Sequence, residues 1–440
     1  MKTDQEIIRE LAPRKFNRAG KLWVGFLLAL ILSSFAAYLY QLKEGLAITG
    51  MRDYAMWGIY ISNFVFFVAM SLVGSLITAI LRLTGANWST PLTRISELIA
   101  VAAIIMAGLT IIIDMGRPER LYYLFIHGRL QSPIIWDVIV ITTYLVLSIL
   151  LLYYPLLPDF TLLKKFYKDK PKASRWFGRL ALNWSGNEEQ TKIFNLSVKV
   201  LSVLIIPVAF GIHTVTAWLF ATTYRPGWDS TNFGPYFIAG AFVAGAGTVI
   251  CVMYVIRNAY GLKDYITDGH FDKMARLLVL LCLVYLYFNV NEYLVPAYKN
   301  TVEERDHLSG LFTGEYSTLF WFAIIGGLVV PIVVLLFKGG RRPLPAFLIG
   351  LLVVVGAWWK RYLIVTPTLL HPFMPVEGVP EDWHHYFPTG PEWIITIGNL
   401  ATASFIVTIL VRYLPIIPIK ETLEERETSL NPKAQPHETA

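Results

Sequence analysis

Two aspartates flank one short segment between two long apolar stretches of the chain. Asp114 closes the first stretch in the string Ile-Asp-Met-Gly-Arg-Pro, and Asp137 lies just inside the second stretch, in Ser-Pro-Ile-Ile-Trp-Asp. A carboxylate within a membrane segment is costly, so its presence indicates a functional site by default. Because Arg117 stands between the two aspartates, the pattern is typical of a site that takes up and releases protons.

Tyr144 follows Asp137 by seven residues, which places it two helical turns along the same face. We therefore expect a carboxylate and a phenol to line one pocket. Two other interpretations are open. Asp137 caps the start of its helix, a position that Asp favours, or Asp114 forms a local ion pair with Arg117. A cap is less natural for Asp114, because the dipole at a helix C-terminus disfavours anions.

More polar residues fall at the same predicted depth. They are Asn63, His213 and Arg361, together with Tyr285, Asn289 and Glu292, which share one helix face. Asparagines in such positions also serve as hydrogen-bonding links between helices, and a lone histidine is often a satisfied core residue. Glu97 lies near the opposite membrane edge, where it is either one end of a proton path or an acid in the first turn of a helix.

The composition indicates which elements position these residues. The 440 residues are 55% hydrophobic and 16% charged, whereas soluble domains carry about 25% charged residues. We therefore expect an all-α polytopic membrane protein. Stretches of about 20 apolar residues predict ten spans, at 22–42, 55–81, 95–116, 134–156, 195–222, 234–257, 273–297, 317–337, 344–367 and 391–413.

The loops between these spans set the predicted orientation. With ten spans, 27 of the 38 Lys and Arg residues fall on one side, which the positive-inside rule makes cytoplasmic. The net charge of +7 therefore reflects topology and not nucleic-acid binding. We expect cytoplasmic segments at 1–21 and 414–440 around a membrane domain at 22–413, in the inner membrane. The tail from about Ile419 is expected to be irregular.

Two observations argue against redox cofactors carried by this chain. Cys251 and Cys282 stand alone in apolar stretches, without the spacing that an iron–sulfur cluster or c-type haem needs. Only His213 is deep inside a span, whereas a membrane b-type haem normally takes two axial histidines. We therefore expect neither a haem nor an iron–sulfur cluster here.

Several strings resemble the NrfD/PsrC family of quinone-reactive membrane subunits. They include Trp-Gly-Ile-Tyr-Ile-Ser-Asn-Phe at 57–64, Gly-Arg-Pro at 116–118, Ser-Pro-Ile-Ile-Trp-Asp at 132–137, Ile-His-Thr-Val at 212–215, Pro-Gly-Trp at 226–228, Pro-Tyr-Phe at 235–237, Arg-Tyr at 361–362 and Tyr-Phe-Pro-Thr at 386–389. The ten spans and the segment Asp-Tyr-Ile-Thr-Asp at 264–268 are most similar to the DsrP/HmcC type, and next to ActC of alternative complex III.

The resemblance implies four-helix-bundle units and a reaction with menaquinone or ubiquinone. It also implies an adjacent ferredoxin-like iron–sulfur subunit on the outer face, further subunits of a redox complex with cytochromes among them, contact with lipid, and a role in sulfur or sulfate metabolism. Two departures stand out. Asp114 stands where several relatives have a histidine. Lys360 stands where relatives often have a glutamate before the arginine that corresponds to Arg361.

The residues and the resemblance together predict a quinone pocket at the outer face between the second and fifth spans. Its reactive residues are expected to be Asp137, Asp114 and Tyr144, its quinone contacts Asn63, Arg117, His213, Tyr236 and Arg361, and its proton path Glu97, Glu292 and Asn289. Two other functions are compatible with ten spans and buried charges: a structural anchor of such a complex, and a secondary transporter. Transporter sites usually lie at the midplane on broken helices.

Overall fold

The computed structural model describes residues 2–85, 87–374 and 377–430, and within them the chain is helical without a strand. Nine stretches there are long and apolar enough to cross a membrane, and a shorter apolar helix covers Ile59–Leu72. The ten together confirm the predicted all-α fold. The helices are α2 (Arg18–Glu44), α3 (Ile59–Leu83), α4 (Thr90–Asp114), α6 (Pro133–Tyr153) with α7 (Leu156–Phe166), α9 (Glu188–Ala221), α10 (Phe233–Ala259), α11 (Asp268–Lys299), α13 (Ser317–Trp321) through α14 (Val330–Leu336), α15 (Pro343–Leu369) and α16 (Gly390–Tyr413).

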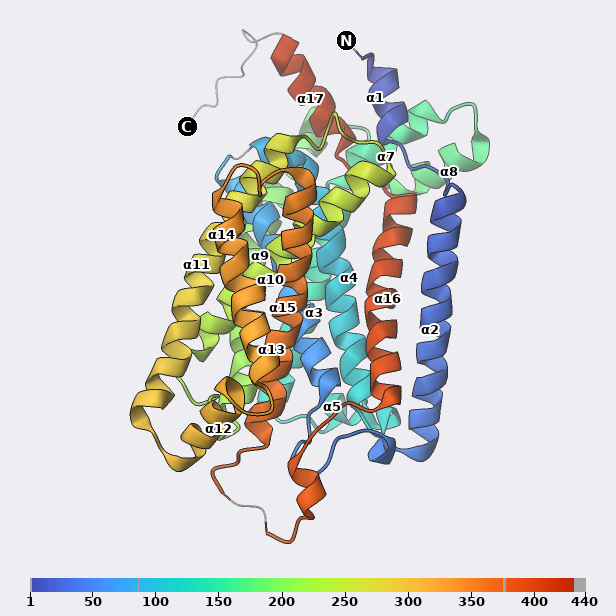
Figure 1. Ribbon diagram of the computed structural model, residues 1–440. Coiled ribbons are helices and arrows are strands. Elements are labelled where there is room, and N and C mark those ends of the chain that lie inside the picture. Colours follow the sequence, from blue (N-terminus) through green and yellow to red (C-terminus); the bar gives the residue numbers. More distant parts are fainter. Residues whose placement is uncertain (1, 86, 375–376, 431–440) are drawn as a thin grey trace.

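The spanning helices form two four-helix bundles, as the resemblance implies. In the first, α3, α4, α6 and α9 each pack against their neighbours in a closed ring. In the second, α10, α11, α14 and α15 do the same. The bundles meet where α10 packs on α3 and α9. Helices α2 and α16 pack against each other, and α16 packs against α3 and α4 of the first bundle (Figure 1).

The first and last helices of the described chain, α1 and α17, lie at the same end of the molecule, as an even number of spans requires (Figure 1). We call this the proximal end, and the opposite one the distal end. The proximal end carries α1 (Asp4–Leu11), α7, α8 (Pro171–Leu180) and α17 (Ile419–Leu430), and the distal end carries α5 (Tyr123–Ile126) and α12 (Val302–Phe312).

The expectation of an irregular tail from Ile419 is wrong for the part that the structure describes. Residues 419–430 form α17, because two contacts hold it in place. The backbone N–H of Lys420 donates to Oδ1 of Asp159 at 3.0 Å, and Arg426 forms an ion pair with Asp4 of α1. For 431–440 the prediction falls outside the described residues.

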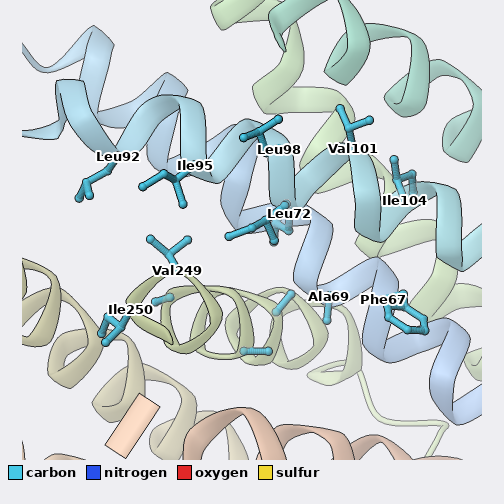
Figure 2. Packing of buried hydrophobic residues seen from close by; sticks show 14 of the residues in the cluster. Phe67, Ala69, Leu72, Leu92, Ile95, Leu98, Val101, Ile104, Val249 and Ile250 are labelled. Carbon is cyan, nitrogen blue, oxygen red and sulfur yellow. The ribbon is translucent and has the colours of Figure 1, made fainter. Parts of the chain in front are cut away.

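The core lies where α3, α4 and α10 converge, and Figure 2 shows their side chains interleaved there. Leu72, Leu98 and Val249 are fully buried at this point. The small residues of α10 allow close approach: a Cβ on Gly247 would lie 3.2 Å from the Gly350 carbonyl oxygen of α15.

Helix α15 runs unbroken through Lys360 and Arg361. Beside it, residues Phe322–Val329 form η4, a π-helical segment that the sequence pattern did not predict. The two helices touch at Gly327 and Gly356, where a Cβ on Gly356 would lie 2.5 Å from the Cα of Gly327.

Candidate functional site

The polar residues of the distal half fall into two groups that differ in how fully they are hydrogen-bonded. The first, which we call the saturated network, centres on the buried Glu392 of α16. Its Oε2 accepts from the backbone N–H of Thr389 at 2.8 Å and of Gly50 at 2.7 Å, and its Oε1 accepts from Tyr386 Oη at 2.6 Å. Tyr386 Oη in turn accepts from the N–H of Ile59 at 2.8 Å. Glu392 therefore joins α16 to the chain before α3.

The same network continues through two amides. Asn63 donates from Nδ2 to Thr396 Oγ1 at 2.9 Å and accepts at Oδ1 from Trp358 Nε1 at 2.8 Å, which joins α3 to α16 and α15. Gln41 accepts from Tyr60 Oη at 2.7 Å and donates to the Ile113 carbonyl at 2.9 Å. Asn63 thus forms the interhelical bonds that were the alternative to quinone contact.

Asp114 lies beside this network as the last residue of α4. Its Oδ1 is buried without a hydrogen-bond partner among the described residues. Arg117 stands exposed in the following loop, and among the described residues the two form no ion pair. The charge that acts on the Asp114 carboxyl is that of Glu392. The local pair that the spacing allowed is therefore not formed.

Asp137 is the fifth residue of α6, whose cap is Ser132, so the alternative of a helix cap is wrong. Its Oδ1 accepts from Thr216 Oγ1 of α9 at 2.7 Å. Tyr144 lies on the same buried face of α6, as the spacing predicts. Its hydroxyl donates to the Ser71 carbonyl of α3 at 2.7 Å, so the two side chains bond to different helices.

The second group lies where the two bundles meet, and we call it the Arg361 cluster. It comprises His213 of α9, Tyr236 of α10, Tyr285, Asn289 and Glu292 of α11, and Lys360 and Arg361 of α15. The guanidinium of Arg361 lies 4.8 Å from the ring centre of Phe237 and donates from Nη2 to the Phe237 carbonyl at 3.3 Å. Its Nη1 is buried without a partner among the described residues.

His213 presents one open nitrogen to this cluster. Its Nδ1 lies 3.2 Å from the Ala209 carbonyl oxygen, one turn earlier in α9. A carbonyl oxygen only accepts, so the ring proton sits on Nδ1 and Nε2 is left as an acceptor. This Nε2 is buried and has no partner in the described chain. His213 lies three residues before Thr216, on the same helix face, and the Arg361 charge acts on it.

Aromatic rings close the cluster on the α10 and α11 side. Tyr236 and Tyr285 stack with centroids 5.3 Å apart, and the hydroxyl of Tyr236 interacts with those of Tyr285 and Tyr293. A Cβ on Gly240 would lie 2.8 Å from Tyr285 Cζ and 2.9 Å from Arg361 Nη2. A side chain at this position would therefore displace the arginine.

Lys360 is buried in a cage of rings. Its ammonium donates to the hydroxyl of Tyr293 and lies 5.1 Å from the ring centre of Phe320 and 5.9 Å from that of Tyr236. Glu292 accepts from Ser230 Oγ at 2.8 Å, but its Oε1 has no partner in the described residues. Sequence reasoning missed this cage, although Lys360 next to Arg361 was the available signal.

Asn289 and His307 extend the pattern of unpaired atoms towards the distal surface. Asn289 donates to the Tyr285 carbonyl at 2.7 Å, and its Oδ1 is unpartnered. His307 of α12 is buried with Nδ1 unpartnered in the described chain. Burial, together with the charges of His371 and Lys360, lowers the pKa of His307 to about 3. His307 is therefore neutral, and it was not among the residues predicted from the sequence.

A small hollow lies between His307 and the cluster. Its lining includes Trp228, Phe233, Tyr236, Glu292 and His307, and its volume is about 20 Å³. A cavity needs roughly 10–15 Å³ to hold one water. The hollow therefore admits water, and a larger molecule enters only if the lining side chains move.

Glu97 lies apart from both groups, near the proximal end. It is the eighth residue of α4 and so does not belong to the first turn. Its carboxylate lies 3.9 Å from Arg94 Nε, and Arg94 also meets Asp159 of α7 at 3.4 Å. All three side chains are buried, so they join α4 to α7 and, through Asp159, to α17.

The distal half thus brings Asp137, His213, Tyr236 and Arg361 into one region, with Asn289 and Glu292 beyond. It places Asn63, Asp114 and Arg117 elsewhere.

Comparison with known families decides what kind of protein has this arrangement. A family model described as "Polysulphide reductase, NrfD" matches residues 47–372. The chain belongs to the NrfD family. This confirms the resemblance drawn from the motifs and agrees with the polytopic helical fold.

Three curated relatives cover nearly the whole chain. A Halobacterium salinarum protein, named provisionally as a membrane subunit of dimethyl sulfoxide reductase, is 27% identical, over 94% of this chain and 96% of its own. The menaquinone reductase integral membrane subunit of Nitratidesulfovibrio vulgaris is 23% identical, over 96% and 98%. The Hdr-like menaquinol oxidoreductase integral membrane subunit of Archaeoglobus fulgidus is 24% identical, over 91% and 96%. The NrfD-family chain described above is therefore similar, end to end, to membrane subunits of redox complexes.

Proposed function

We propose that this NrfD-family chain is the quinone-reactive membrane subunit of a multi-subunit redox complex, and that the Arg361 cluster is its quinone site. One observation carries the proposal: Arg361 Nη1 and His213 Nε2 are both buried without a partner among the described residues. Buried polar groups in proteins are normally paired. Two unpaired groups at one junction between bundles therefore support a ligand that pairs with them.

The chemistry of these groups fits a quinone. A guanidinium donates only, so Arg361 suits the carbonyl oxygen of a quinone or the oxygen of a deprotonated quinol. The Nε2 of His213 accepts, so it suits the hydroxyl of a quinol. The rings of Phe237 and Tyr236 offer flat apolar surfaces against which a ring packs.

Oxidation of a quinol releases two protons and two electrons. In our proposal His213 Nε2 takes the proton of one hydroxyl, and Arg361 stabilises the negative charge that develops on that oxygen. Asp137, which is linked to α9 through Thr216, takes the second proton. Run in reverse, the same residues deliver protons to a quinone, so the proposal covers menaquinol oxidation and menaquinone reduction alike.

The relatives' names favour menaquinone over ubiquinone, because two of the three name menaquinone or menaquinol. The electrons pass to a partner subunit at the distal end, for which the family resemblance suggests a ferredoxin-like iron–sulfur protein. Since 27 of the 38 Lys and Arg residues lie at or near the proximal side, we place the distal end outside the inner membrane and both termini in the cytoplasm.

The route by which protons leave the cluster involves the other buried residues that carry unpaired atoms. Glu292 and His307 line the same small hollow at the distal end, and Asn289 lies one turn before Glu292 on α11. We propose that these residues connect the cluster to the distal surface. Glu97, which interacts with Arg94, is better explained as part of a structural link.

Arg361→Gln in the purified complex tests the proposal. Losing one preorganised donor to a developing charge costs roughly 10²–10³-fold in rate, so quinol-dependent electron transfer should fall by about that factor. Arg276→Gln is the matched control, because Arg276 lies on α11 and is exposed, with its ion pair to Asp272 at the surface. Full activity of Arg361→Gln would refute the site. Assembly of a complex that neither contains nor oxidises quinol would indicate the structural anchor instead.

A further inference from the structure

The hairpin of α7 and α8 is a rigid feature of the proximal end that the quinone proposal leaves unused. Phe177 of α8 is buried and stacks on Tyr167 with centroids 5.7 Å apart and on Phe160 at 6.1 Å. Ser174 Oγ also donates to the Lys164 carbonyl at 3.2 Å. The two short helices are therefore held together, and the groove between them has a defined shape.

This groove is lined by basic side chains. It has a volume of about 540 Å³. Its basic lining residues are Lys164 of α7, Lys168 of the turn after α7, and Arg175 and Arg179 of α8, and its neutral ones are Pro171, Ser174, Gly178, Leu182 and Asn183. A Cβ on Gly178 would lie 3.4 Å from Cδ and Cε of Lys164, so the glycine lets the lysine chain lie close against α8. No acidic residue lines the groove.

The four cations form no ion pair with any acidic residue that the structure describes. All four are exposed, and none takes part in an ion pair in the described part of the chain. Like charges gathered around one groove repel each other. The groove is therefore complementary to a ligand that carries negative charge.

Apolar side chains stand exposed beside the cations. Trp176 of α8 is 49% exposed and Leu182, just after α8, is 67% exposed. Leu182 and Asn183 both have positive φ, at 45° and 59°, a conformation that asparagine tolerates but that is strained for leucine. The fold thus accepts strain at the point where a leucine is presented outwards. Cations next to an exposed tryptophan and leucine are the pattern of a helix at a membrane surface.

The position of the hairpin agrees with this pattern. Helix α7 begins at Leu156, three residues after α6 ends at Tyr153, so the hairpin follows directly from a membrane span. Figure 1 shows α7 and α8 at the proximal end, with α8 at the edge of the molecule. The groove therefore lies at the height where lipid headgroups end and the aqueous phase begins.

We propose that this groove binds the phosphodiester headgroup of an anionic glycerophospholipid. Lys164, Lys168, Arg175 and Arg179 surround the phosphate, and Trp176 and Leu182 contact the glycerol and upper acyl chain. The exposed apolar pair distinguishes a lipid from a free phosphate compound, which has no part to place against it. The bound lipid holds the hairpin, and through Asp159 of α7 the C-terminal helix α17, against the membrane.

The test uses the full-length protein purified in a neutral detergent and stripped of lipid. Phosphatidylglycerol is titrated in, and binding is followed by native mass spectrometry and by the thermal unfolding temperature. Each neutralised Lys or Arg costs about 1 kcal/mol of attraction to anionic lipid. A variant with Lys164→Gln, Lys168→Gln, Arg175→Gln and Arg179→Gln should therefore bind roughly 10³-fold more weakly.

A matched control removes the same number of charges from the same segment but away from the groove. Lys165→Gln, Lys170→Gln, Lys172→Gln and Lys192→Gln are all at exposed positions and should leave binding within about threefold. Equal loss in the two quadruple variants would overturn a defined site. Equal binding of phosphatidylcholine would overturn the role of charge. Stabilisation by glycerol 3-phosphate alone, at the same concentration, would overturn a lipid ligand.

A second variant keeps the proposal testable if the quadruple variant folds poorly. Trp176→Ala with Leu182→Ala changes only exposed side chains. It should weaken phosphatidylglycerol binding about tenfold or more and leave the preference for anionic over zwitterionic lipid intact. Unchanged affinity in this variant would contradict the lipid assignment.

Discussion

The saturated network and the Arg361 cluster lie in the same half of the molecule and use the same kinds of residue, yet they are bonded in opposite ways. Glu392 has three protein donors within 2.8 Å, whereas Arg361 Nη1 and His213 Nε2 have no partner in the described chain. In a membrane, a saturated polar group locks helices together, and an open one is a place for a ligand. Polarity at a given depth does not separate these roles, and in our proposal the open hydrogen-bonding atoms of Arg361 and His213 are what distinguishes the quinone site.

The buried ion pair of Arg94 with Asp159 at the proximal end is also a link between helices, although Arg94 Nη1 has no hydrogen-bond partner among the described residues. The pair links helices through buried, paired charges, as Glu392 does through hydrogen bonds. The comparison therefore predicts that substitutions in saturated groups reduce stability, and that substitutions in the Arg361 cluster reduce activity.

The largest expected effect is on stability, at Glu392. Glu392→Ala leaves the N–H groups of Thr389 and Gly50 and the hydroxyl of Tyr386 without their acceptor, which should cost roughly 3–5 kcal/mol. The thermal unfolding temperature of the purified protein measures this. Glu381→Ala is the control, since Glu381 is exposed in the segment before α16. If the Glu392 variant is as stable as the control, the network does not lock the helices.

The next effect is on turnover, at His213. His213→Phe removes the accepting Nε2 and should lower quinol-dependent electron transfer by about 10²-fold. Stability should stay level or rise, because the variant also removes a buried acceptor that lacks a partner. Activity and unfolding temperature are measured on the same preparation. A loss of stability without a loss of turnover would show that His213 stabilises the fold and does not act on the quinol.

A pH effect should follow from His307. Burial lowers the pKa of His307 to about 3, below the value near 6.5 of the unfolded chain. Its contribution to stability is therefore complete above pH 6.5 and is lost as the pH falls towards 3. At pH 5 the loss should be about 2 kcal/mol.

His307→Phe should flatten the dependence of the unfolding temperature on pH between 7 and 5. His127→Phe provides the control, because His127 is exposed and should leave the slope unchanged. An unaltered slope in the His307 variant would show that this residue is not buried in its neutral form.

The smallest effect is expected at Thr216. Thr216→Val keeps the shape of the side chain but removes the donor to Asp137 Oδ1. One such bond is worth roughly 0.5–1.5 kcal/mol, so turnover should change by about tenfold or less. Steady-state assays with varied quinol concentration measure it. A loss as large as that of His213→Phe would mean that Thr216 itself contacts the substrate.

Much of the fold followed from the sequence, because apolar length and loop charge are strong signals. Ten apolar stretches became ten helices, and even the stretch broken by Lys360 and Arg361 is one continuous helix. The π-helical segment η4 and the terminal helix α17 were not foreseen. Segment η4 packs closely on α15 at Gly327 and Gly356, and α17 is held by the bond from Lys420 to Asp159. Both contacts join residues that are far apart in the sequence and that no local pattern pairs.

The site was predicted less completely, because the depth of a residue along its helix does not say which neighbouring helix its side chain contacts. Asp137, His213 and Arg361 were correctly placed in the distal half, but the two aspartates that first drew attention lie on different sides of the first bundle. Asp114 is influenced by Glu392 of α16, and Asp137 bonds to α9. Which residues are saturated also depends on partners far away in the sequence, such as Thr396 for Asn63 and Gly50 for Glu392.

The most direct test of the account is an experimental structure of the intact complex with a bound quinol analogue. The account predicts that the head group lies within hydrogen-bond distance of Arg361 Nη1 and His213 Nε2, with Trp228 or Phe233 displaced from the small hollow. A head group bound against Asn63, Tyr60 and Asp114, with the Arg361 cluster unchanged, would contradict it.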